Sequence, residues 1–177
     1  MDLALVEDLL KKYKRKPLFD HEGLPFKLAI SREQVKMIIP QREPVLYVDE
    51  ISALDLKEGL ISGRRYLDPK DPVFSGHFPD FPVYPGSYTI EMIGQLGLCL
   101  YYFVHNQTEI IASTAKPVAL RATRILGAVF MQPLLPGKDI LLLAKKLAYD
   151  GFLATAIGQA IVDGKVACVS IGEVAFL

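Results

Sequence analysis

The stretch Phe74 to Val104, which reads FSGHFPDFPVYPGSYTIEMIGQLGLCLYYFV, decides the fold of this chain. Its first half is too rich in proline and glycine for regular structure and predicts a loop. Pro85 suits the first position of a helix, and because no proline follows before Val104, we expect a helix of about twenty residues. Glu91 is the only formally charged side chain in that helix, so the sequence predicts a buried central helix with one carboxylate in the interior.

Three polar side chains form a stripe along this apolar helix. Ser87, Glu91 and Gln95 recur at every fourth position, which places them on one helix face. His77 precedes them in the predicted loop. Histidine is a base near neutral pH, whereas a carboxyl group in apolar surroundings tends to keep its proton and act as an acid. His77 as base and Glu91 as acid therefore predict chemistry of the β-elimination type, in which one group takes a proton and the other gives one.

The start of the helix adds backbone donors to this pair. The N–H groups of Gly86 and Ser87 would open the helix, where oriented donors and the positive end of the helix dipole can polarise a carbonyl oxygen. A metal site built on His77, Asp80 and Glu91 is the alternative use of these side chains. One histidine with two carboxylates is a poor match to common metal sites, so we expect no metal.

Composition excludes several classes of protein. The chain has 177 residues, enough for one core, and its 20 basic side chains balance 20 acidic ones, which gives no electrostatic case for nucleic acid. Cys99 and Cys168 lie in apolar runs and are typical of core residues in a reducing compartment. We find no secretory signal or transmembrane span in the sequence, so we expect a soluble, cytoplasmic protein.

Strand patterns dominate the rest of the chain. We expect short helices over residues 3–13 and 35–39, the second preceded by a capping box of Ser31 and Gln34. Alternating or β-branched runs predict strands over 45–53, 60–67, 118–131, 140–149, 152–162 and 165–177, the last three joined by Asp-Gly turns. The fold class is therefore α+β, an antiparallel sheet wrapped around the central helix.

The central motif resembles the signature of the FabZ-type 3-hydroxyacyl-[acyl-carrier-protein] dehydratases, GHFPxxPVxPG followed by an IE...Q helix. The resemblance rests on Gly76-His77-Phe78-Pro79, Pro82-Val83, Pro85-Gly86, Ile90-Glu91 and Gln95. Pro40-Gln41-Arg42 and Pro136-Gly137 are similar to other segments of the family. The related FabA branch has aspartate in place of Glu91. The resemblance covers 35–177, so we divide the chain into an N-terminal extension, 1–30, and a dehydratase domain, 31–177.

The resemblance implies a hot-dog fold and the removal of water from a 3-hydroxyacyl thioester to give the trans-2-enoyl thioester, with no cofactor. It implies a homodimer, alone or as a trimer of dimers, whose active site combines His77 and Glu91 of different chains. His77 would take the C2 proton, Glu91 would protonate the 3-hydroxyl, and the Gly86 N–H would hold the thioester carbonyl. Acyl carrier protein would dock at a basic patch, for which the candidates are Arg121, Arg124, Lys145 and Lys146. Alternatively, these side chains are simply the solvated faces of strands.

We expect substrate contacts from Phe78, Tyr84, Ser87, Tyr88 and Gln95. This chain departs from the family pattern at Gln41, where the family has histidine, and near the helix start, where the tyrosines are bulkier than usual. Two alternatives stay open: a non-catalytic acyl-binding module and a hot-dog acyl thioesterase. The amphipathic N-terminal helix would cover the acyl tunnel or contact another subunit.

Overall fold

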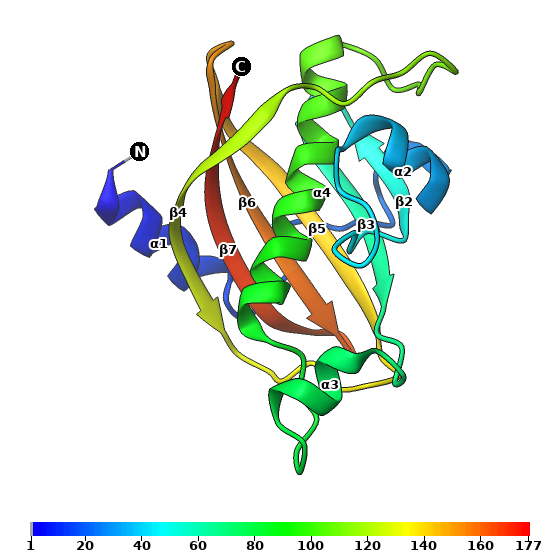
Figure 1. Ribbon diagram of the computed structural model, residues 1–177. Helices are drawn as coiled ribbons and strands as arrows, with labels where there is room; N and C mark the ends of the chain where they lie inside the picture. The colour runs from blue at the N-terminus through cyan, green and yellow to red at the C-terminus, as the bar shows by residue number, and fades with distance from the viewer. Residues whose placement is uncertain (1) are drawn as a thin grey trace.

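A computed structural model describes residues 2–177 and shows a long helix, α4, held against one face of a curved sheet (Figure 1). The elements are α1 (Leu3–Tyr13), β1 (Phe26–Ser31), α2 (Arg32–Ile38), β2 (Glu50–Asp55), β3 (Leu60–Tyr66), α3 (Pro72–His77), α4 (Gly86–Asn106), β4 (Leu120–Phe130), β5 (Asp139–Tyr149), β6 (Leu153–Val162) and β7 (Lys165–Phe176). The described strands form one antiparallel sheet in the order β1-β2-β3-β5-β6-β7-β4. The predicted α+β class is confirmed.

The helix α4 buries one broad face and leaves another open. Met92, Leu96, Leu100 and Phe103 recur at every fourth or third position and are fully buried in the core. Glu91, however, is exposed in the single chain, so the prediction that it lies in the interior is wrong for one protomer. The reason is that the sheet covers only part of the helix, and the side that carries Ser87, Glu91 and Gly94 faces outward.

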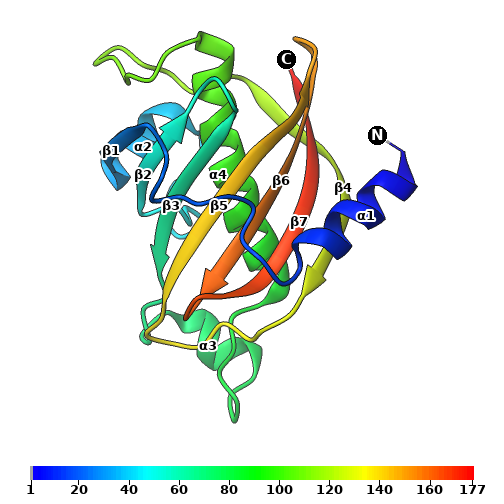
Figure 2. The ribbon, with the colours of Figure 1, turned by 180° about the vertical axis from the view of Figure 1, so that it is seen from behind.

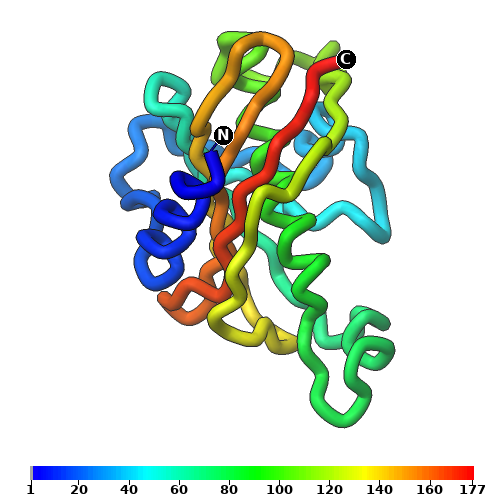
Figure 3. The backbone as a smooth tube through the Cα atoms, turned by 90° about the vertical axis from the view of Figure 1, so that its left-hand side faces the viewer, coloured from blue at the N-terminus to red at the C-terminus, as the bar shows by residue number. Residues whose placement is uncertain are grey.

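The N-terminal segment lies on the opposite face of the sheet. Figure 2 shows α1 and the chain after it running across the outer side of β5, β6 and β7, and Figure 3 shows the sheet between α1 and α4. Val6, Leu10 and Leu18 are buried there in a second apolar cluster with side chains of β5, β6 and β7. The expected helix at residues 3–13 is confirmed, but the expectation that it covers the tunnel beside α4 is wrong.

A single glutamine fastens this segment to the sheet. Gln159 of β6 is fully buried. Its Oε1 accepts a hydrogen bond from the Leu18 N–H at 2.8 Å, and its Nε2 donates to the carbonyl oxygens of Tyr13 and Lys16 at 2.6 and 2.9 Å. Beyond this point the chain enters β1, which pairs with β2 and was not predicted. The first thirty residues thus contribute to the same sheet and core as the rest.

The strand predicted over 45–53 begins later than expected, because β2 starts at Glu50. The side chain of Gln95 explains the shift. Its Oε1 accepts from the Tyr47 N–H and its Nε2 donates to the Val45 carbonyl oxygen, both at 2.7 Å. Since these backbone groups bond to a side chain of α4, they do not join a strand ladder.

The loop predicted before α4 begins with a short helix instead. Pro72 occupies the first turn of α3, and the Asp71 carboxylate accepts a hydrogen bond from the Val73 N–H at 3.0 Å, so the helix is capped in the usual way. His77 is the last residue of α3 rather than part of a loop. Within residues 2–177, no helix is long and apolar enough to cross a membrane.

Candidate active site

His77 is held by the chain that follows it. Its Nδ1 lies 2.9 Å from the carbonyl oxygen of Val83. A carbonyl oxygen can only accept, so Nδ1 carries the proton in this contact and Nε2 keeps its lone pair. The ring also stacks on Phe78, with the ring centroids 4.0 Å apart. His77 is therefore oriented with one nitrogen available as a base.

The first residue of α4 shares a cavity with His77. Gly86, Phe130 and Cys168 line this cavity together with His77 and Val83. A Cβ placed on Gly86 would lie 2.9 Å from the Phe130 ring, which is closer than a real side chain allows. Glycine thus lets the ring approach the helix start. The Gly86 N–H is one of the four at the start of a helix that lack an intrahelical acceptor, so it can donate to an oxyanion in this cavity.

Glu91 is oriented from behind by Gln95. Its Oε1 accepts a hydrogen bond from Gln95 Nε2 at 2.9 Å. Gln95 is fully buried, and its amide also holds Val45 and Tyr47 as described above. Gln95 was predicted to contact the substrate. In the single chain it lies buried beneath Glu91 and holds the carboxylate in position.

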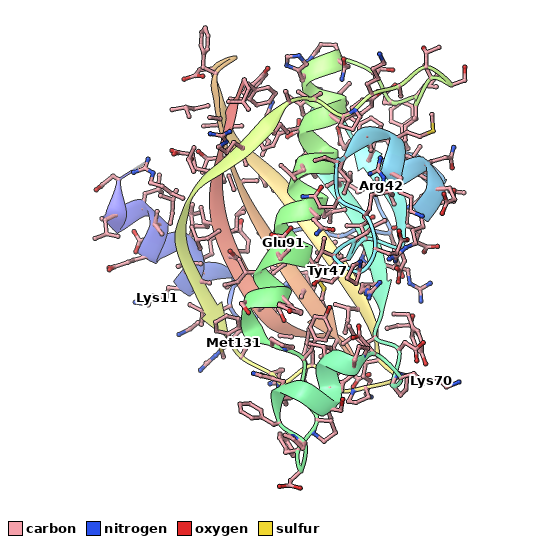
Figure 4. The ribbon with its side chains drawn as sticks, viewed as in Figure 1. Lys11, Arg42, Tyr47, Lys70, Glu91 and Met131 are labelled. Atoms are coloured by element: carbon pink, nitrogen blue, oxygen red, sulfur yellow. The ribbon has the colours of Figure 1, made fainter. Side chains whose placement is uncertain are left out.

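A groove runs along α4 from Glu91 between the helix and the concave face of the sheet. From α4 it is lined by Ile90, Glu91, Gly94, Gly97, Leu98 and Tyr101, and the sheet contributes small residues that include Ala122, Ala144, Ala154, Ala156, Gly158 and Gly172. Figure 4 shows Glu91 at about the middle of the molecule on α4, with Met131 near the far end of β4. An apolar groove with a carboxyl group near one end suits an acyl chain.

His77 and Glu91 line different cavities in the single chain. The groove beside Glu91 has a volume of about 180 Å³, smaller than the roughly 300–1,000 Å³ of ordinary ligand sites. One protomer therefore carries the base with the backbone donor in one cavity, and the acid with the groove in another.

The other predicted substrate contacts divide into exposed and buried ones. Phe78 and Tyr88 are 52% and 41% exposed, and Ser87 is exposed as well. Tyr84 is buried, and its ring packs with Tyr47 at 6.3 Å and with Tyr88 at 5.9 Å between centroids. Burial raises the pKa of the Tyr84 hydroxyl. Tyr84 packs in the aromatic cluster and also lines the cavity that holds His77. Phe78, Ser87 and Tyr88 are exposed in the single chain.

The predicted basic docking patch loses one of its candidates. Arg124 binds Glu173 through two parallel contacts, Nε to Oε1 at 3.0 Å and Nη2 to Oε2 at 2.8 Å. Hydrogen bonds from Arg124 and Thr123 lower the pKa of the Glu173 carboxyl to about 2. Because Arg124 is already paired in the wall of the groove, it is a poor docking residue. Phe130 and Tyr101 were missed by the sequence analysis, since an aromatic residue in an apolar run carries no local sign of its role.

Comparisons with known proteins show which family the chain resembles. A family model described as a FabA-like domain matches residues 39–170. The chain is 32% identical over 141 residues to the 3-hydroxyacyl-[acyl-carrier-protein] dehydratase FabZ of Polynucleobacter asymbioticus, which covers 79% of this chain and 88% of that protein.

Solved structures with the same fold are more distant in sequence. The dehydratase heterocomplex ApeI:P of Xenorhabdus doucetiae matches with a TM-score of 0.64 at 12% identity, over 81% of this chain and 90% of the other. A thioesterase from Pseudomonas aeruginosa matches with a TM-score of 0.52 at 15% identity, over 72% of this chain and 80% of the other. The predicted hot-dog fold is confirmed.

Proposed function

The chain belongs to the FabA-like family and, within it, to the FabZ-type 3-hydroxyacyl-[acyl-carrier-protein] dehydratases, and we propose that His77, Glu91 and Gly86 carry out its reaction. The enzyme removes water from a 3-hydroxyacyl chain on acyl carrier protein to give the trans-2-enoyl thioester. The positions of their polar atoms support the role proposed for each residue.

His77 is the base of this proposal. The Val83 carbonyl oxygen holds Nδ1, which leaves Nε2 to take the proton from C2 of the acyl chain. The negative charge that develops on the thioester oxygen is stabilised by the N–H of Gly86, which lines the same cavity. The electron pair of the broken C2–H bond then forms the C2=C3 double bond.

Glu91 is the acid. As the C3–O bond breaks, the protonated carboxyl gives its proton to the departing hydroxyl, which leaves as water. Gln95 Nε2 holds one oxygen of Glu91 at 2.9 Å, so the other oxygen is free to face the substrate. The proton gained by His77 and the proton lost by Glu91 balance, and exchange with solvent restores both groups.

We propose that the complete site needs two chains. His77 and Glu91 line separate cavities in one protomer, and Glu91 is exposed on the open side of α4. The strand β4 is an edge of the sheet and carries the exposed apolar residues Ile125 and Phe130. A second copy placed against this edge would cover the exposed groove and bring its own Glu91 toward His77. A trimer of such dimers and a cytoplasmic location stay predictions.

The observation that carries the proposal is the His77–Val83 contact, because it leaves Nε2 free on a ring that lines the same cavity as Gly86 at the start of α4. The test is turnover of 3-hydroxyacyl thioesters on carrier protein, followed by the absorbance of the enoyl product. Wild-type turnover that is lost in a folded His77→Ala variant supports a dehydratase. Bound acyl chains without turnover would support the acyl-binding module, and release of free thiol would support the thioesterase.

A further inference from the structure

Along α4, the last residue that lines the groove beside Glu91 is Tyr101. It is 2% exposed. Its hydroxyl donates to the Thr155 carbonyl oxygen at 2.6 Å and lies 3.0 Å from that of Ala148. Because these two carbonyls belong to β5 and β6, the ring is fixed at both its helix and its sheet end. A side chain held in this way cannot swing aside at little cost.

Aromatic side chains fill the space behind Tyr101. Its ring centroid lies 5.9 Å from that of Tyr149 and 6.2 Å from that of Phe176. His105 stacks on Phe176 at 5.1 Å and contacts the Tyr149 hydroxyl through Nδ1 at 2.7 Å. These rings come from the last turn of α4 and from the ends of β5 and β7. Packed rings therefore support the Tyr101 ring on the side away from Glu91.

We propose that Tyr101 is the end wall of the acyl groove and limits the length of the acyl chains that this enzyme accepts. The proposal rests on the dehydratase function proposed above. It assigns a specificity role to Tyr101, because the α4 positions Gly94 and Gly97 leave room for a chain, while Tyr101 is the last residue of α4 in the groove lining and carries a large ring.

The helix sets the length of the groove. Tyr101 follows Glu91 by ten positions, which corresponds to roughly 15 Å along the axis, and since both side chains lean toward the helix N-terminus, the spacing between them stays about the same. An extended chain advances roughly 1.2 Å per bond, so the groove holds about twelve atoms beyond C3. Acyl chains of more than about fifteen carbons should not fit.

The experiment compares kcat/KM for acyl chains below and above this limit, written as the ratio of long to short. In wild type we expect the ratio to be at least about tenfold below one, as for a pocket that must take one methylene too many. Tyr101→Ala should raise the ratio about tenfold or more, whereas Tyr101→Phe, which keeps the ring but loses its hydroxyl contacts, should raise it clearly less than Tyr101→Ala does. Tyr102→Ala is the matched control, since Tyr102 is equally large, is buried, and lies outside the groove lining.

A second variant, Gly94→Leu, keeps the proposal testable if Tyr101→Ala does not fold. Gly94 borders the groove on the open side of α4, and because a Cβ there would meet no atom within 4 Å, Gly94→Leu should fold and narrow the groove. It should lower turnover of medium chains relative to the shortest ones by about tenfold. Equal turnover of long and short chains by wild type, or an unchanged ratio in folded Tyr101→Ala or Gly94→Leu, would overturn the proposal.

Binding separates this proposal from the dehydratase function. The same acyl thioesters are titrated calorimetrically into wild type and the same variants. If no acyl chain is turned over, but affinity falls for chains above the length limit and recovers in Tyr101→Ala, the proposed dehydratase function is wrong and the role of Tyr101 as end wall is supported. If chains are turned over but neither binding nor turnover depends on Tyr101, the end wall fails alone.

Discussion

Glu91 and Gln95 lie one helical turn apart on α4 and share a 2.9 Å hydrogen bond, although one side chain is exposed and the other fully buried. The same Gln95 amide holds the backbone of Val45 and Tyr47. One buried side chain thus connects the orientation of the proposed acid with the path of the segment before β2.

The two partners of this hydrogen bond should differ in their effect on stability. Glu91→Gln should lower kcat by about a hundredfold or more, because the amide cannot donate an acidic proton, and should change unfolding free energy by less than about 0.5 kcal/mol. Gln95→Leu should also lower kcat, and should cost about 1–3 kcal/mol because two buried backbone groups lose their partners. Denaturant unfolding and turnover measure both. Equal stability loss in the two variants would contradict the assignment.

His77→Ala should reduce kcat by about a hundredfold to ten-thousandfold. The half-buried ring makes one hydrogen bond, to Val83, so the thermal midpoint should change little. Thermal unfolding by circular dichroism and the enoyl assay measure the two effects. A large fall in the midpoint with activity retained per folded molecule would show that His77 is structural.

Mixing two inactive variants tests whether the site is shared between chains. In a dimer of His77→Ala with Glu91→Gln, one site loses both groups and the other keeps both. If the chains assort at random, co-refolded protein should recover about one quarter of wild-type activity. Recovery close to zero, with mixed dimers demonstrated by mass spectrometry, would place both residues of a site in the same chain.

Loss of the Gln159 contacts should loosen the N-terminal segment without affecting chemistry. Gln159→Leu deprives the Leu18 N–H and the carbonyls of Tyr13 and Lys16 of their partner, at a cost of about 1–3 kcal/mol. Because α1 and α4 lie on opposite faces of the sheet (Figure 3), kcat of the folded variant should stay near wild type. Hydrogen exchange should increase in residues 3–18. Unchanged exchange would contradict the fastening role.

Glu173 should contribute to stability at neutral pH and not in strong acid. Its folded pKa is lowered to about 2 by the hydrogen bonds from Arg124 and Thr123. A lowered folded pKa stabilises the protein above the unfolded value of about 4.3 and loses this contribution as the pH falls toward about 2. Urea unfolding from neutral pH to about pH 2.5 should therefore show a shallower dependence for Glu173→Gln. Parallel curves for both proteins would rule out the contribution.

Local patterns accounted for most of the elements. The helix at residues 3–13, the long helix and the four strands after it were all predicted, because apolar periodicity and Asp-Gly turns act over a few residues. Two segments begin differently from the prediction: the strand expected over 45–53 starts only at Glu50, and the loop expected before α4 begins with the helix α3. Before β2, the Val45 carbonyl oxygen accepts a hydrogen bond from the side chain of Gln95, fifty residues away in the sequence. Before α4, Asp71 and Pro72 start the helix α3.

The sequence alone determined which residue types stand at the candidate site, since the motif around His77 and the interval to Glu91 are written in the chain itself. Only the tertiary structure decided where these groups face. It left Glu91 on an open side of α4, put Gln95 beneath it, and placed Tyr101 in the lining of the groove. These facts depend on contacts between β5, β6 and α4, and the side on which a sheet leaves a helix uncovered follows from how distant strands curve, which no local spacing records.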